Sequence, residues 1–271
     1  SGVGGVSRYD GQNWKHYTTE NGLAENFTLR MIEDSRGNFW APAGNPFGGG
    51  KGVSWFDGKR WTTLTVKDGL IDNGVMSVFE DRDGYLWFGT QAGASRYDPE
   101  TGVFTNLAPE AGLAGDWVSA IAQDAEGNLW FCSGDYTNGG KGVARYDGKS
   151  FTIFDEKDGM LYPNSWMAFV DRDDNMWFSG LRGLTRYDGK TFTTVDFPGL
   201  PMFAGPWMDQ DLKGNLWANT MSYGAVRYDG KSSRFYTIED GLATNSVQGV
   251  FADREGFVWF GNNKGSISQY D

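Results

Sequence analysis

The sequence predicts an all-β fold, a six-bladed β-propeller of four-stranded antiparallel blades. An aspartate-led turn, Asp-x-x-Gly in most copies, precedes a strand that carries a tryptophan six times. A period of roughly 40 to 50 residues made only of strands and turns is typical of propeller blades. Aromatic residues make up 16% of the chain, and no segment keeps a 3.6-residue apolar period, so almost no helix is expected. The six tryptophans are Trp40, Trp87, Trp130, Trp177, Trp217 and Trp259, spaced 47, 43, 47, 40 and 42 residues apart.

One repeat, residues 73–107, shows how each blade is expected to form. Residues 75–79 are a β-prone run and predict the innermost strand. Residues 81–84 (Asp-Arg-Asp-Gly) predict the turn that ends this strand. Residues 86–88 predict the second strand, 94–97 the third and 103–107 the outer fourth strand. The blades are expected at about 26–65, 73–108, 116–155, 164–196, 205–239 and 246–271, within a single domain spanning 1–271.

Asp-Gly pairs join the third and fourth strands in most repeats. They lie at 57–58, 147–148, 188–189 and 229–230, and a longer loop over 98–102 replaces them in the second repeat. Asp-Gly between alternating strands predicts a hairpin with a type I′ turn, in which both central residues have positive φ.

The two ends of the chain predict a closed ring. Residues 246–270 supply three strands of the last blade, and the N-terminal residues 6–18 supply a further third strand and an outer strand. An N-terminal strand that docks on the last blade would remove two open sheet edges. Which of the two third strands completes that blade is left open by the sequence.

Five of the expected third strands carry an arginine, followed in each case by Tyr-Asp. We expect these arginines to pair with repeated carboxylates such as Asp81 and Asp124, rather than to form an anion-binding ring. The Asp-x-x-Gly turns lack the spaced oxygen donors of a calcium loop, so no metal site is predicted. The arginines are Arg8, Arg96, Arg145, Arg186 and Arg227.

Composition excludes several partners. The net charge is −11 and the Lys and Arg residues are scattered, so neither nucleic acid nor an anionic membrane surface is an expected partner. No apolar run approaches the roughly 18 residues of a membrane span. The single cysteine, Cys132, excludes an intrachain disulfide and is expected as a small residue between blades. The start at Ser-Gly-Val-Gly-Gly fits a trimmed product, and secretion is compatible with it.

The repeat resembles that of two-component-regulator propellers. The resemblance lies in Asn73-x-Val75, Asp81-x-x-Gly84-x-Leu86-Trp87-Phe88-Gly89-Thr90 and Gly93-x-x-Arg96-Tyr97-Asp98, and it recurs over essentially the whole chain. That family is usually found in periplasmic sensing regions of bacterial hybrid histidine kinases, where propellers bind ligands such as oligosaccharides. The resemblance therefore implies a periplasmic or extracellular location, although folds do not dictate function.

The Leu-Trp-Phe strands are also similar to those of streptogramin lyase type propellers. That family uses a histidine and a magnesium site with further His and Glu residues. The only histidine here is His16, on an expected outer strand, so the catalytic residue does not carry over.

A binding site is expected where the repeats disagree, in the loops between second and third strands and in the connections between blades. Tryptophans precede or begin three inner strands, and Asp209 stands where the equivalent residues 32, 79, 122, 169 and 251 are apolar. These features predict an aromatic-lined funnel at the axis with a few polar anchors; the alternative is that the tryptophans plug the channel. The candidate ligand-binding residues are Arg30, Phe47, Trp117, Asp135, Tyr136, Trp166, Arg182, Trp207, Asp209 and Tyr223.

Three functions stay open from the sequence. The first is a non-catalytic sensor propeller for a carbohydrate or other small molecule, without a cofactor. The second is a lyase or hydrolase that uses Asp116, Asp135 or Asp209, with or without a divalent metal. The third is a protein-interaction scaffold that could form a homodimer. The chain contains neither Gly-x-Ser-x-Gly nor His-Glu-x-x-His, which favours the binder.

Overall fold

The computed structural model confirms an all-β, six-bladed propeller fold with very little helix. It describes residues 4–45, 48–134, 142–160, 164–180, 183–197, 207–220, 222–262 and 265–271. Contacts within the chain divide it into two compact units, Ser1–Phe154 and Asp155–Asp271. The helical elements of the described residues are four three-residue 3₁₀ turns, η1 (Thr19–Asn21), η2 (Pro109–Ala111), η3 (Glu156–Asp158) and η4 (Ile238–Asp240).

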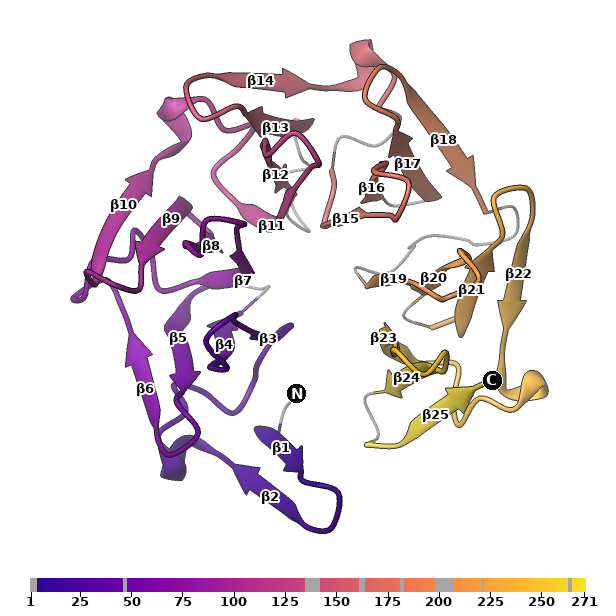
Figure 1. The fold of residues 1–271 in the computed structure, drawn as a ribbon, viewed down its shortest axis with the longest axis horizontal. Helices are drawn as coiled ribbons and strands as arrows, with labels where there is room; N and C mark the ends of the chain where they lie inside the picture. Colours follow the sequence, from indigo (N-terminus) through magenta and orange to yellow (C-terminus); the bar gives the residue numbers. More distant parts are fainter. Residues whose placement is uncertain are drawn as a thin grey trace. The chain divides into compact units, whose positions relative to one another are not determined.

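The first unit contains an N-terminal hairpin and three blades (Figure 1). The hairpin pairs β1 (Val6–Tyr9) with β2 (Trp14–Tyr17). Blade one is β3 (Ile32–Glu33), β4 (Phe39–Gly44), β5 (Gly50–Phe56) and β6 (Trp61–Leu64). Blade two is β7 (Val75–Glu80), β8 (Leu86–Thr90), β9 (Gly93–Asp98) and β10 (Val103–Leu107). Blade three is β11 (Val118–Gln123), β12 (Leu129–Ser133), β13 (Gly142–Tyr146) and β14 (Phe151–Phe154).

The second unit contains blades four to six. Blade four is β15 (Met167–Val170), β16 (Met176–Ser179), β17 (Gly183–Tyr187) and β18 (Phe192–Asp196). Blade five is β19 (Met208–Gln210), β20 (Leu216–Asn219), β21 (Ala225–Tyr228) and β22 (Ser233–Tyr236). Blade six has three strands, β23 (Val247–Ala252), β24 (Val258–Asn262) and β25 (Ile267–Tyr270).

The aspartate of each turn and the tryptophan of the next strand are hydrogen-bonded to each other in all six blades. The indole Nε1 donates to a carboxylate oxygen six residues earlier, so the motif folds back on itself. Burial raises the pKa of Asp34, but the bonds from Trp40 and Asn38 outweigh it and hold that pKa below its usual value. The six bonds are Trp40–Asp34, Trp87–Asp81, Trp130–Asp124, Trp177–Asp171, Trp217–Asp211 and Trp259–Asp253, at 2.7–2.8 Å.

These bonds correct the expectation that the third-strand arginines pair with the turn aspartates. Arg145 instead lies over the Trp130 ring at 5.8 Å, and Arg96 lies over the Tyr85 ring at 4.5 Å. Arg186 donates to the Asn175 side-chain oxygen at 2.7 Å. The carboxylate already accepts the indole and backbone N–H groups, so the guanidinium packs on a ring or bonds an amide.

The Asp-Gly hairpins form as predicted, but their turns are not type I′. Between the paired residues Phe56 and Trp61 the loop has four residues, and Asp57 Oδ1 accepts the N–H groups of Lys59 and Arg60 at 2.8 Å. Gly58 has a positive φ of 90°, but Asp57 does not have a positive φ, because Asp174 is the one non-glycine residue with positive φ in the described part of the chain. A type I′ turn would require positive φ at both residues. The aspartate therefore caps the turn through its side chain instead of adopting a left-handed conformation.

Side chains also fasten neighbouring blades at their turn ends. Gln123 of blade three accepts the Arg82 N–H of blade two at 2.9 Å, and the Arg82 guanidinium donates to the Ala125 carbonyl at 2.8 Å. In the second unit, Gln210 of blade five accepts the Arg172 N–H of blade four at 2.9 Å. The inner strands β11 and β19 therefore each end in a glutamine that accepts a backbone N–H of the preceding blade.

The N-terminal hairpin packs on blade one. Tyr17 is buried against Phe56 and Trp61, with ring centroids 5.2 and 5.8 Å apart. The second strand of blade six, β24, pairs with β25, so the C-terminal copy of the third strand is the one used there. Strands β1 and β2 form a separate two-stranded sheet. The predicted completion of blade six by an N-terminal strand stays a prediction.

Candidate functional site

In the first unit, the predicted site residues that the structure describes, Arg30 and Trp117, lie at blade ends rather than inside strands. Arg30 is exposed and precedes β3, and Trp117 is half-buried directly before β11. Asp116 beside it is exposed. Gln91 of blade two holds the loop of blade one, because its side chain accepts the Gly49 N–H and donates to the Asn45 carbonyl at 2.8 and 2.7 Å.

In the second unit, Trp166 is buried, which favours a packing role for this one tryptophan. Its indole N–H donates to the Asn164 side-chain oxygen at 2.9 Å, and its backbone N–H donates to Ser179 at 3.3 Å. The three tryptophans directly precede their inner strands, but Trp166 and Trp207 pair with different positions of the second strand. They are therefore not equivalent members of one ring of side chains.

Trp207 and Tyr223 of blade five are connected through the residues between them, a group that we call the blade-five rim (Trp207, Asn219, Thr220 and Tyr223). The Asn219 side-chain oxygen accepts the Trp207 N–H at 3.0 Å, and the Trp207 carbonyl accepts the Asn219 N–H at 3.1 Å. Thr220 Oγ1 accepts the Tyr223 N–H at 3.1 Å. Trp207 is half-buried and Tyr223 is 45% exposed, so both rings sit at one blade end with accessible surface.

Asp209 occupies the position that the sequence assigned to it. It pairs with Trp217, just as residues 32, 79, 122, 169 and 251 pair with the tryptophans of their own blades. The half-buried Asp209 carboxylate accepts the N–H of Ala252 in blade six at 2.9 Å and that of Gln210 at 2.8 Å. The expected partner of this carboxylate is thus the backbone of the neighbouring blade.

Phe47, Asp135, Tyr136 and Arg182 lie outside the described residues. Among the residues that are described, no three His, Cys, Asp or Glu side chains gather as metal ligands would. Over the same part of the chain, no helix is long and apolar enough to cross a membrane.

Sequence reasoning missed Asn219, which anchors Trp207. The signal was present, because Asn219 follows its tryptophan by two residues, where four other blades carry the small residues Gly89, Cys132, Ser179 and Gly261. Asn219 is fully buried, and a buried amide requires hydrogen-bond partners.

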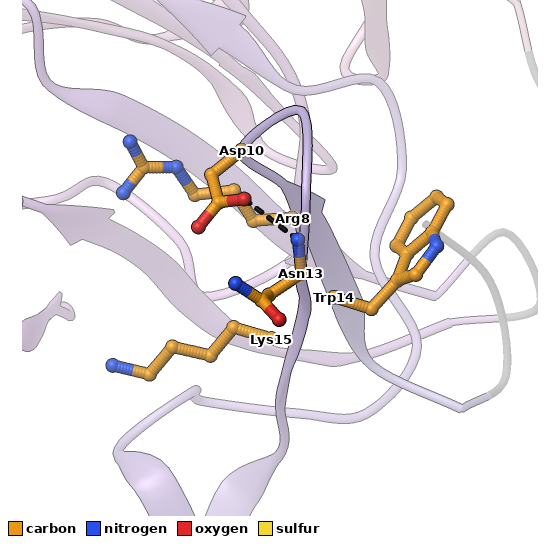
Figure 2. A pocket seen from close by; sticks show the side chains of 5 residues that line it. All are labelled: Arg8, Asp10, Asn13, Trp14 and Lys15. Carbon is orange, nitrogen blue, oxygen red and sulfur yellow. Dashed lines mark hydrogen bonds between the residues drawn. The ribbon is translucent and has the colours of Figure 1, made fainter.

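An open pocket of about 350 Å³ lies on the N-terminal hairpin (Figure 2). Arg8 and Lys15 face each other across the two strands, and Asp10 Oδ1 accepts the Asn13 N–H at 2.7 Å. The Trp14 side chain points away from these charges in Figure 2 and stacks on Tyr9 with ring centroids 4.9 Å apart. The two rings are 66% and 53% exposed, so the hairpin offers a charged face and an aromatic face.

Comparison with known proteins places the fold among sensor and enzyme propellers. Two segments, residues 69–92 and 112–135, match the family model described as two component regulator propeller. No curated protein sequence matches the chain.

Three solved structures illustrate the similarity. The extracellular domain of the putative hybrid two-component system BT3049 from B. thetaiotaomicron is 21% identical, with a TM-score of 0.78 over 99% of this chain and 36% of that one. A catalytically inactive virginiamycin B lyase from Staphylococcus aureus is 16% identical, with a TM-score of 0.75 over 98% and 87%. PorZ, a surface component of the type-IX secretion system of Porphyromonas gingivalis, is 18% identical, with a TM-score of 0.72 over 98% and 43%. The chain thus spans about a third of the length of the sensor domain that it resembles.

Proposed function

We propose that the chain is a ligand-binding propeller of an extracytoplasmic sensor and that it recognises a carbohydrate or another neutral small molecule without turning it over. The observation that carries this proposal is the blade-five rim, where Trp207 and Tyr223 present accessible rings beside buried, fully engaged polar groups. Aromatic faces suit sugar rings and flat apolar ligands. The extracellular sensor domain of similar fold supports the location and the sensing role.

The arrangement of carboxylates supports binding over catalysis. Asp209 already accepts two backbone N–H groups, so its charge is used to hold blade six. General acid–base chemistry needs a carboxyl group within hydrogen-bond reach of the substrate. The remaining candidate acids are Asp116, which is exposed, and Asp135, which lies outside the described residues.

A thermal-shift panel of neutral glycans and metabolites, with and without divalent ions, tests the proposal. We expect at least one compound to raise the melting temperature without product formation, because a ligand that binds only the folded state stabilises it. Trp207→Ala should weaken that compound at least tenfold in calorimetry, whereas Trp14→Ala should leave its affinity unchanged. Metal-dependent product formation would support the lyase or hydrolase instead, and normal affinity of Trp207→Ala would remove the rim as the site.

The exposed Tyr9–Trp14 stack favours a second candidate function, a protein-interaction surface. Large exposed aromatic groups are enriched at interfaces. Analytical ultracentrifugation of the wild type and of Trp14→Ala would test it: a dimer that dissociates in the variant supports this function, and a monomer at all concentrations argues against a homodimer.

A further inference from the structure

Blades five and six are joined by side chains that other blades do not have. Asn219 Nδ2 donates to the carbonyl of Val247, the first residue of β23, at 3.1 Å. Asp209 accepts the N–H of Ala252, the last residue of β23, at 2.9 Å. The inner strand of blade six is therefore held at both of its ends by polar side chains of blade five.

The rim end of this junction differs from its equivalents in the first unit. A Cβ on Gly89 of blade two, the residue equivalent to Asn219, would collide with the carbonyl of Val118, the first residue of the next inner strand. At blade five the corresponding carbonyl, that of Val247, accepts a hydrogen bond from an asparagine side chain. The asparagine of blade five thus makes a hydrogen bond to the next inner strand that the glycine at the equivalent position of blade two cannot make.

The turn end of the junction differs as well. Gln123 and Gln210 end their inner strands with a side-chain acceptor for the preceding blade, but β23 ends in Ala252, which has no such group. Asp209 makes the contact in the reverse direction, from blade five to the Ala252 N–H. Asn219 and Asp209 therefore contact β23 at its first and its last residue, both from blade five.

Trp207 lies at the Asn219 end of this junction. Asn219 binds its backbone N–H and carbonyl, and Asp209 follows it by two residues, which places both side chains on the same side of the strand. Met208 between them packs toward blade four with Met167 and Phe197. The backbone of Trp207 is thus bound by one of the two residues that contact blade six and lies two residues from the other.

We propose that Asn219 and Asp209 are positioning residues that form a two-point clamp on β23 and fix Trp207 for ligand recognition without contacting the ligand themselves. This inference rests on the proposed function, because it takes Trp207 as a ligand contact. Rigid support of a binding side chain lowers the entropic cost of binding. Loss of either clamp residue should therefore move Trp207 even in the ligand-free protein.

Fluorine NMR of the protein labelled with 5-fluorotryptophan tests the clamp without any ligand. The Trp207 resonance is assigned as the signal that Trp207→Phe removes. We expect Asn219→Ala and Asp209→Ala to shift and broaden it, while Asp209→Asn, which keeps an acceptor for Ala252, retains its wild-type position. Gln123→Ala is the matched control, since it removes a bridge between blades two and three.

An unmoved Trp207 signal in folded Asn219→Ala and Asp209→Ala would overturn the inference, as would an equal shift in Gln123→Ala. If Asn219→Ala does not fold, the contrast between Asp209→Ala and Asp209→Asn decides. The outcome is separable from the proposed function. A shifted Trp207 signal supports the clamp even if the panel yields no ligand. An unmoved signal together with tight ligand binding supports the proposed function and contradicts the clamp.

Discussion

At the scale of single residues, the Asp–Trp bond explains why the repeat takes its form. Asp81 is buried, and its Oδ1 accepts the N–H groups of Asp83 and Tyr85, while its Oδ2 accepts the Trp87 indole. One carboxylate thereby shapes the turn and fixes the strand that follows. The sequence identified both residues of this pair but assigned the aspartate to an arginine, because charge pairing is easier to anticipate than an indole donor six residues away.

Replacing Trp87 with Phe should destabilise the protein by about 1–3 kcal/mol, since a buried carboxylate oxygen loses its donor. Urea unfolding followed by circular dichroism measures the loss. Trp259→Phe is the matched control, because Trp259 and Asp253 are only half-buried and water can replace the indole. Equal losses in both variants would show that ring packing, and not the buried bond, dominates.

At the scale of strands and turns, the periodic pattern predicted the elements well. The expected outer strand of blade two, residues 103–107, matches β10, and the other three strands of that blade differ by one or two residues at an end. The type I′ turn was wrong because side-chain capping by aspartate competes with a left-handed backbone. Asn219 and the clamp were not predicted, because a contact between blades depends on how two repeats pack and not on either repeat alone.

The hairpin aspartates predict a loss of stability in acid. Backbone donors, the N–H of Arg60 first and then that of Lys59, hold the pKa of Asp57 below its ordinary value of 3.8, and the pKa values of Asp147, Asp188 and Asp229 are lowered in the same way. A lowered folded-state pKa gives stability that is complete above the unfolded value and is lost as pH falls through the folded value. We expect a constant urea midpoint at neutral pH and a decline below about pH 4.

Substitution by asparagine isolates this contribution. Asp188→Asn keeps an oxygen for the N–H groups of Lys190 and Thr191 but does not titrate. Its urea midpoint should therefore fall less steeply between pH 4 and pH 2 than that of the wild type. An identical acid profile would mean that other carboxylates account for the decline.

The N-terminal hairpin is the element whose packing is simplest to test. Tyr17→Ala should cost about 3 kcal/mol or more, because it empties a buried site between Phe56 and Trp61. Trp14, at the other end of β2, is 66% exposed, so Trp14→Ala should change stability by less than about 0.5 kcal/mol. If Tyr17→Ala also leaves the free energy of unfolding unchanged, the hairpin does not contribute to the folded core.

At the scale of the whole molecule, the repeat predicts that all 271 residues form one cooperative domain. In a repeat protein each unit is stabilised mainly by its neighbours, so cooperative unfolding reports that every junction is strong. Cys132, the only cysteine, is fully buried in the first unit, and Trp217 is fully buried in the second. Thiol labelling of Cys132 and the fluorine signal of Trp217 therefore follow the two units separately through a urea titration. We expect coincident midpoints; midpoints separated by more than the fitting error would show that residues 1–154 and 155–271 unfold independently and that the single-domain prediction is wrong.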